Sequence, residues 1–375
     1  MKIGILTYHR SHNYGALLQA VALRVALESM GNEVYYIDYF PEYHRRMYML
    51  FDWQSFRGTA GLKKRTKYLY RVFQTLLPKM VRRHSFEAFI NKWISPYCVS
   101  MKESFDCVIY GSDQIWRKQP FINDYNPFYF GLNDLKTRIH ATYAASLSSL
   151  PETKDDTDHF CALVAYLDKI SVRERSIKDF LSEYIIKDIH IDVDPCLLLS
   201  KERWASLIPN KELINERYIL LYDLQSDYGI RVFNEEEVQG FAERNCCSLV
   251  RVRAVASRRN DIFDRHSAGP EDFINLIRNA TCVVTSSYHG VVLSLVFDRP
   301  FLCSFSKNSQ RALDLMNEVG LKSCILEPGH AFPYKVSSLE HNSLNVLHSL
   351  INQSNDYLSH LDEVSGKLGS EYLHT

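Results

Sequence analysis

The sequence lacks most of the features that would place it in a specialised class of protein. Its 44 Lys and Arg balance 44 Asp and Glu, so the chain as a whole has no character of a polyanion-binding protein. No apolar stretch is long enough to cross a membrane. The N-terminus, MKIGILTYHR, has too short an apolar run for a signal peptide. We therefore expect a cytoplasmic protein.

Paired cysteines and metal motifs are also lacking. The nine cysteines are odd in number, and no two of them form a CxxC pair. Most lie in apolar runs such as FDCVIY and TCVVTS, which is typical of reduced thiols buried in strands. The sequence has no HExxH motif and no paired carboxylates with ligand spacing, so we expect neither a metal site nor a cofactor.

What is present is a repeated alternation of strand and helix patterns. An apolar run at Lys2–Thr7, a helical pattern at Ala16–Met30 and a second β-rich run at Glu33–Asp38 predict a βαβ unit, and such units make parallel sheets. Further strands are predicted at 105–110, 137–144 and 169–172.

A second series of strands and helices begins at Arg217, with RYILLYDL, CSLVRVRA, TCVVTSS and PFLCSF as its strands. At 375 residues the chain is too long for one ordinary core. We predict an α/β protein with two Rossmann-like lobes facing a cleft, the first at 1–210 and the second at 211–337. A helical tail at 338–375 is expected to pack back on the first lobe.

A basic helical insertion, at about 42–90, interrupts the first lobe. Between Arg45 and Arg83 there are eleven Lys or Arg against one acid, Asp52, and aromatic residues are interleaved with them. Basic amphipathic helices with aromatic faces suit an anionic membrane surface. The alternative is a solvated helical hairpin balanced by acids elsewhere. No nucleic-acid-binding motif accompanies the charge, and we expect no nucleic acid partner.

Ligands of such folds collect at the carboxyl ends of parallel strands, so polar residues there are candidates. The first group, SHNYG at 11–15, leads into the first helix, and the backbone amides of Ser11, Asn13 and Gly15 can bind an anion or a sugar hydroxyl. The alternative is a helix cap with a permissive turn.

Two further strand ends carry polar residues. Ser112 and Asp113 follow the strand FDCVIY, and Asp113 could act as a base or bind a hydroxyl. Arg173 follows the strand Lys169–Val172, where an arginine suits a phosphate or carboxylate. Capping and solvated turns are the structural alternatives.

The sharpest candidate is His289 in TSSYHGVVLSLVFDRPF, held at a strand–helix junction among Ser286, Ser287 and Gly290. An imidazole there can serve as a general acid or base, although a lone histidine is more often structural. Lys307 and Arg311 follow the next strand and could add positive charge to the same pocket.

Six segments, in this order, carry a resemblance to a known family: NYGALLQ, GSDQIW, YAAS, SVRERS, DVDPCLLL and SSYHGVVLSLVFDRPF. The chain resembles the polysaccharide pyruvyl transferase family. The resemblance implies a GT-B-like fold and transfer of a pyruvyl group from phosphoenolpyruvate, as co-substrate, to a sugar of a capsular or cell-surface polysaccharide precursor. The product is a cyclic ketal.

The resemblance also implies roles for single residues. It matches the family's essential histidine to His289, its arginine after the middle strand to Arg173 and its downstream lysine to Lys307. Many relatives carry Arg or Asp just before the histidine, where this chain has Ser286 and Ser287.

We expect His289, Asp113 and Arg173 to be catalytic. Donor binding is expected at Ser286, Ser287, Gly290, Lys307 and Arg311, and acceptor binding at His12, Asn13, Tyr14, Gly15 and Ser112. The acceptor could be linked to polyprenyl diphosphate, with the protein peripheral at the inner membrane face.

Two other functions remain open. A GT-B glycosyltransferase would share the architecture and could hold the ribose of a nucleotide sugar through Glu271 or Asp272. A non-catalytic sugar-binding protein would keep the fold without the chemistry, and the serines before His289 are the feature that favours it.

Overall fold

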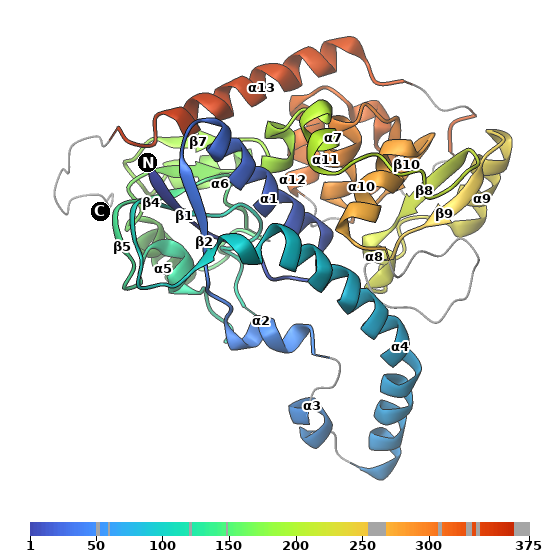
Figure 1. The fold of residues 1–375 in the computed structure, drawn as a ribbon, viewed down its shortest axis with the longest axis horizontal. Helices are drawn as coiled ribbons and strands as arrows, with labels where there is room; N and C mark the ends of the chain where they lie inside the picture. Colours follow the sequence, from blue (N-terminus) through green and yellow to red (C-terminus); the bar gives the residue numbers. More distant parts are fainter. Residues whose placement is uncertain are drawn as a thin grey trace.

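The described residues form three parallel sheets, of five, four and two strands, with helices packed against them (Figure 1). The computed structural model describes residues 1–49, 53–58, 61–119, 122–147, 149–253, 268–306, 310–327, 332–334 and 338–363. All strand pairs in these residues are parallel, as the alternation of strand and helix patterns predicts.

The first lobe is built on a five-stranded sheet that a two-stranded sheet extends. In spatial order its strands are β3 (Cys98–Val99), β2 (Glu33–Ile37), β1 (Lys2–Leu6), β4 (Ser104–Tyr110) and β5 (Lys136–Thr142), followed by β6 (Ile170–Val172) and β7 (Ile189–Ile191). Isolated parallel bridges, such as Ala145 with Val172, join β6 to the β5 edge. Shorter helices connect them: η1 (Ser95–Tyr97), η2 (Pro127–Phe130), α5 (Lys154–Val164) and α6 (Arg175–Ser182).

The second lobe is a four-stranded sheet in the order β11 (Phe301–Cys303), β10 (Cys282–Thr285), β8 (Tyr218–Tyr222) and β9 (Ser248–Arg251). Its helices are α8 (Leu224–Asp227), α9 (Glu235–Arg244), α10 (Pro270–Asn279), α11 (Tyr288–Val296), α12 (Gln310–Glu318) and η4 (Lys322–Cys324). The predicted fold class, two Rossmann-like lobes in a GT-B-like arrangement, is confirmed.

Helix α1 (Tyr14–Ser29) lies between the lobes and is buried from Tyr14 to Leu27. It packs on β2, on η3 (Pro195–Leu198) and on α10 of the second lobe (Figure 1). A helix that is apolar all round must be enclosed by other elements. One apolar core therefore runs from the first sheet through α1 into α10 and α11, and helix α7 (Lys201–Leu207) adds the buried Trp204 to it.

The last helix, α13 (His341–Ser359), returns to the first lobe as predicted. Its Tyr357 hydroxyl donates a 2.8 Å hydrogen bond to the carbonyl of Thr142, and Val193 N donates one of 2.9 Å to Ser354 Oγ. Both are buried, so this helix is part of the first lobe's packing.

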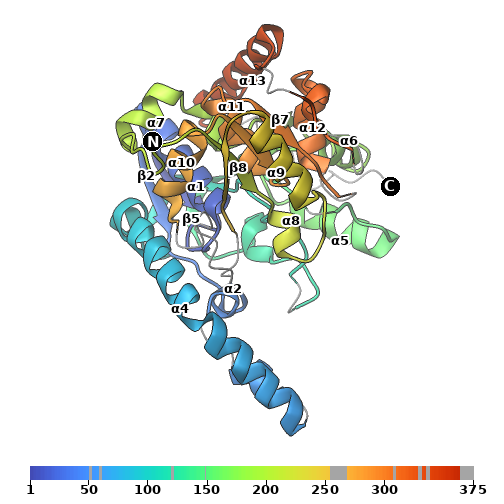
Figure 2. The same ribbon diagram turned by 90° about the vertical axis from the view of Figure 1, so that its right-hand side faces the viewer.

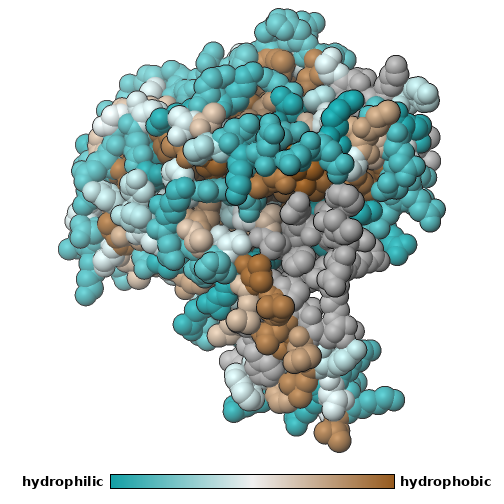
Figure 3. Space-filling model, turned by 45° about the vertical axis from the view of Figure 1, so that its right-hand side comes forward, coloured by the Kyte–Doolittle hydropathy of each residue, from teal (hydrophilic) through white to brown (hydrophobic). Residues whose placement is uncertain are grey.

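The basic insertion forms three helices, α2 (Glu42–Met47), α3 (Trp53–Gly58) and α4 (Leu62–Trp93). The outer half of α4 projects away from the body (Figures 1 and 2). Leu62, Leu69, Phe73, Leu77 and Met80 are exposed on it, and their spacing places them on one side of the helix. Figure 3 shows the apolar column on this projection.

The inner half of α4 packs on both lobes. Its buried Arg82 donates hydrogen bonds to Tyr14 Oη at 3.1 Å and to the carbonyl of Arg253 at 2.9 Å. Near its end, Lys92 and Trp93 each donate a 2.8 Å hydrogen bond to Glu271 of α10. In the residues described, no helix combines the length and apolarity that a membrane span requires.

The contacts of α13 with the first lobe predict that Tyr357 contributes to the stability of the fold. Tyr357→Phe removes the hydroxyl that satisfies the buried Thr142 carbonyl, and we expect it to lower the free energy of unfolding by about 1 kcal/mol. Tyr357→Ala also leaves a cavity and should cost about 3–5 kcal/mol. Chemical denaturation followed by circular dichroism measures both, with the exposed Tyr166→Phe as the control. A stability of Tyr357→Ala equal to wild type would show that α13 does not dock on this lobe.

Candidate active site

The loops that follow β1, β4, β6, β7 and β10 meet where the lobes face each other. They bring together Asp113, Arg173, Asp194 and His289, the last from the second lobe. The carboxyl ends of the strands therefore supply the polar residues, as the parallel topology predicts.

A buried carboxylate, Asp194, lies at the centre of this cluster. Its Oδ2 is 3.0 Å from Arg173 Nη2 and 3.3 Å from His289 Nε2, and its Oδ1 accepts a 2.9 Å hydrogen bond from Cys196 N. Burial disfavours ionisation, but the charges of Arg173 and His289 outweigh it and hold the pKa of Asp194 well below its usual range. The contact between Asp194 and His289 crosses between the lobes.

Asp194 was not among the predicted site residues. A signal for it existed in DVDPCLLL, where a carboxylate follows a short strand and precedes a proline. The residue caps η3 by accepting the bond from Cys196, so a cap and a site residue look alike in the sequence.

His289 lies directly against Gly15 of α1. A Cβ at Gly15 would be 2.0 Å from Nδ1 of the His289 ring, which is far inside van der Waals contact. The glycine in NYGALLQ is therefore required by the close approach of the imidazole. Asn13 caps the same helix by accepting a 3.2 Å hydrogen bond from Ala16 N.

The cluster opens into a cavity of about 240 Å³ between the lobes, which we call the cleft. Its predicted lining residues are Asn13, Gly15, Asp113, Ser287, His289 and Arg311. Ser11, which was predicted with the loop before the first helix, also lines the cleft. Lining residues that the sequence did not predict are Tyr8, Ala16, His44, Met47, Tyr48, Gln114, Arg117, Tyr222, Leu224 and Tyr228. The tyrosines and His44 lie on several elements, and no local motif marks them.

Asp113 has a left-handed backbone with φ of 73° and lies 3.7 Å from Arg311 Nη1. Burial opposes its ionisation, but the charges of His289, Arg311 and Arg173 outweigh burial and keep its pKa below the ordinary value. The carboxylate is therefore ionised near neutrality and can accept a hydrogen bond from a hydroxyl.

Two arginines keep buried donors without partners among the described residues. Arg173 Nε and Nη1 have no hydrogen-bond acceptor, and neither has Arg311 Nη1, which lies 3.7 Å from Asp113 Oδ1. Both guanidinium groups lie over the ring of Tyr288, at 5.0 and 5.2 Å from its centroid. Such buried donors are costly unless an acceptor reaches them, so their arrangement suits an anion with several oxygens.

Several predicted residues lie behind the cleft instead of lining it. Ser112 is buried, donates to the carbonyl of Ala144 at 3.0 Å and accepts from Arg173. The ring centroids of Tyr14 and Phe273 are 4.3 Å apart, and the Tyr14 hydroxyl donates a hydrogen bond to the Ala268 carbonyl. Tyr14 therefore belongs to the core.

The remaining predicted residues, three on the donor side and His12 on the acceptor side, have separate positions. Ser286 donates a 2.6 Å hydrogen bond to Asp223, and a Cβ at Gly290 would be 2.3 Å from Thr285 Oγ1, so both stabilise the junction. His12 lies in a neighbouring cavity, and Lys307 lies outside the described residues. No group of three His, Cys, Asp or Glu in the described part of the chain could hold a metal ion.

One carboxyl beside the site predicts a pH dependence of stability. Burial raises the pKa of Glu174 to about 7, although Arg173 and a 2.5 Å hydrogen bond from Ser146 oppose the shift. Between pH 4.5 and 7 the unfolded chain loses this proton while the folded chain keeps it, so folding becomes less favourable as pH rises. We expect wild type to lose about 3 kcal/mol more than Glu174→Gln over this range. Denaturation at both pH values tests this, and parallel curves would contradict it.

Comparisons with solved structures give distant similarities. The chain is 13% identical to UDP-GlcNAc 2-epimerase from Methanocaldococcus jannaschii, with 94% of this chain and 92% of that chain covered and a TM-score of 0.45. It is 11% identical to a putative UDP-N-acetylglucosamine 2-epimerase from Listeria monocytogenes, with 96% and 90% covered and a TM-score of 0.44. No curated protein matches the sequence.

The family comparison covers most of the chain. The family model of the polysaccharide pyruvyl transferases matches residues 13–304. This range begins at the helix under His289 and ends just after β11, so it contains Asn13, Asp113, Arg173, Asp194 and His289. With its architecture and this match over most of its length, the chain belongs to the polysaccharide pyruvyl transferase family.

Proposed function

We propose that the protein transfers the pyruvyl group of phosphoenolpyruvate to a sugar of a capsular or cell-surface polysaccharide precursor and forms a ketal. The observation that carries this proposal is the set of buried guanidinium N–H groups of Arg173 and Arg311 that have no hydrogen-bond acceptor, beside His289. Phosphoenolpyruvate offers a phosphate and a carboxylate, and the planar guanidinium of arginine forms bidentate hydrogen bonds with the oxygens of either group.

The reaction needs two proton transfers in the cleft, which we assign to His289 and Asp113. A proton from His289 is added to the methylene carbon, and a sugar hydroxyl attacks the cationic carbon that results. Asp113, which is ionised, accepts the proton of that hydroxyl. The C–O bond to phosphate then breaks, and a second hydroxyl closes the ketal. The two hydroxyl groups release two protons. One replaces the proton that His289 gave to the methyl group, and the other leaves with phosphate.

Asp194 acts through other residues. It is fully buried behind the cleft and contacts both Arg173 and His289, so it fixes the orientation of the imidazole and guanidinium groups. We propose it as a positioning residue. Ser286 and Ser287, the residues before the Tyr288–His289 pair, carry no charge. The positive charge of the cleft lining therefore comes from Arg311 and Arg117.

The nucleotide-sugar alternative gains no support from its expected residues. Glu271 accepts hydrogen bonds from Lys92 and Trp93, and Asp272 accepts one of 3.1 Å from Gly269 N. Both carboxylates stabilise the start of α10 and neither lines the cleft. No contact in the site favours a non-catalytic sugar-binding protein.

We further propose that the acceptor is attached to a lipid and that the protein docks on an anionic membrane at the inner face. The support is the outer half of α4. Its exposed apolar side chains lie within a segment, 53–86, that contains no Asp or Glu. Apolar side chains on one side of a basic helix insert at the boundary of lipid headgroups and chains.

The reaction predicts the behaviour of two variants. His289→Gln removes the acid, and we expect acceptor-dependent release of phosphate from phosphoenolpyruvate to fall at least about 100-fold. Gly15→Ala keeps every polar group but displaces the imidazole, and should also lose most activity. The matched control is Gly240→Ala, whose Cβ meets only the end of Arg244. Full activity of His289→Gln, or turnover of a nucleotide sugar instead, would refute the proposal.

The membrane proposal predicts a charge- and surface-dependent interaction. Wild type should sediment with phosphatidylglycerol vesicles and less with phosphatidylcholine vesicles or in high salt. Phe73→Asp with Leu77→Asp removes about 2 kcal/mol of burial per residue and should abolish binding. The control is Ile186→Asp, at a similarly exposed position elsewhere. If the double variant instead converts a dimer to a monomer, the α4 face is a contact between copies.

A further inference from the structure

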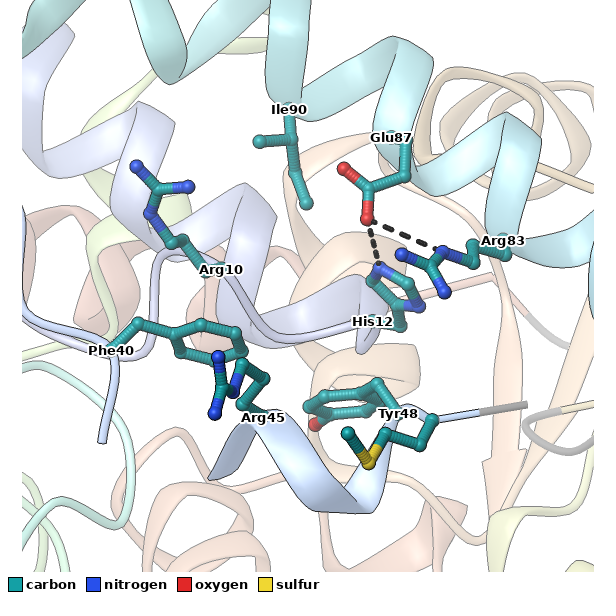
Figure 4. A pocket seen from close by; sticks show the side chains of 9 residues that line it. Arg10, His12, Phe40, Arg45, Tyr48, Arg83, Glu87 and Ile90 are labelled. Atoms are coloured by element: carbon teal, nitrogen blue, oxygen red, sulfur yellow. Dashed lines mark hydrogen bonds and ion pairs between the residues drawn. The ribbon is translucent and has the colours of Figure 1, made fainter. Parts of the chain in front are cut away.

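A second cavity, also of about 240 Å³, lies beside the cleft and has no part in the proposed reaction. It is enclosed by the loop after β1, by α2 and by α4. Arginines from all three elements line it: Arg10, Arg45 and Arg83 (Figure 4). We call it the arginine cavity.

The arginine cavity has more positive charge than its own acids balance. Its one acidic lining residue, Glu87, lies 3.1 Å from His12 Nε2 and 3.8 Å from Arg83 Nε. Arg10 pairs with Asp38 at 2.7 Å, yet its buried Nε has no partner in the described residues. Arg45 forms no ion pair with any residue that the structure describes. Three guanidinium groups around one space suit a phosphate-type anion.

Part of the lining is apolar. Phe40, Met49 and Ile90 share the cavity with the arginines. A free sugar or a simple inorganic anion would leave these side chains without a matching surface. A phosphate ester attached to a hydrocarbon chain would contact both kinds of side chain.

The position of the cavity connects two other features. Tyr48 lines both the cleft and the arginine cavity, and the consecutive residues His44 and Arg45 of α2 face the cleft and the cavity respectively. On α4, Arg83 follows the exposed Met80 by one turn. The cavity therefore lies between the apolar side of α4 and the cleft.

We propose that the arginine cavity binds the diphosphate group of a lipid-linked acceptor, whose sugar then occupies the cleft. This inference rests on the proposed function and names the acceptor's chemical class. The lipid chain would leave along the apolar side of α4, and the diphosphate would fix how far the sugar reaches past Tyr48. Free diphosphate is the other source of the same chemistry, and the test separates the two.

Binding of farnesyl diphosphate and of inorganic diphosphate, measured by calorimetry, tests the cavity without any turnover. We expect farnesyl diphosphate to bind at least about tenfold more tightly, and Arg45→Ala to weaken it about tenfold. Arg203→Ala, an exposed arginine elsewhere, should leave it unchanged. Equal affinity for inorganic diphosphate, or no effect of Arg45→Ala, would overturn the proposal.

Kinetics then separate this inference from the reaction itself. Arg45→Ala should raise KM about tenfold for a sugar linked to a lipid diphosphate, with kcat unchanged, and should leave KM for the free sugar and for phosphoenolpyruvate unchanged. Equal effects on both acceptors would overturn the assignment of the cavity. Absence of pyruvyl transfer in wild type would refute the proposed function, while the binding result would still decide what the cavity holds.

Discussion

The site depends on one buried carboxylate, Asp194, held between a guanidinium and an imidazole. Asp194 has no exposed surface, and its charge is tolerated because Arg173 and His289 lie within 3.3 Å of it. Arg173 and Asp194 belong to the first lobe and His289 to the second. The contact between Asp194 and His289 therefore forms only when the two lobes are packed together, and it couples the integrity of the interface to the orientation of the imidazole.

This packing imposes constraints on residues that carry no charge. The imidazole can reach Asp194 only over the start of α1, where Gly15 leaves room for it. Tyr288 lies beneath both Arg173 and Arg311, so the ring that precedes the histidine also arranges the two guanidinium groups. The polar groups are thus placed by apolar contacts around α1, α10 and α11.

Helix α2 contributes side chains to both cavities. One of its faces supplies His44 to the cleft, and the next residue, Arg45, belongs to the arginine cavity. Burial lowers the pKa of His44 to about 4, with Arg117 acting in the same direction, so His44 is neutral in the cleft. A short helix in the basic insertion therefore separates the proposed sites for the sugar and for its phosphates.

Local pattern was enough to predict most of the architecture. The alternation of apolar strands with helices specifies parallel sheets, and the predicted strands and helices differ from those observed by a few residues at their ends. The position of His289 at a strand–helix junction, and of Asp113 and Arg173 after strands, also follows from local pattern together with the general rule for such sheets.

The sequence by itself determined two parallel α/β lobes, a basic insertion and the strand ends where polar residues gather. Only the tertiary structure decided which of those residues meet. Asp194 was not predicted because a capping aspartate and a site aspartate have the same local signature, and Tyr14 was assigned to the site although Phe273, far along the chain, encloses it. The separation of His12 from the cleft likewise depends on α4 packing beside the first loop. Such contacts join residues from distant segments, and no local periodicity encodes their distance.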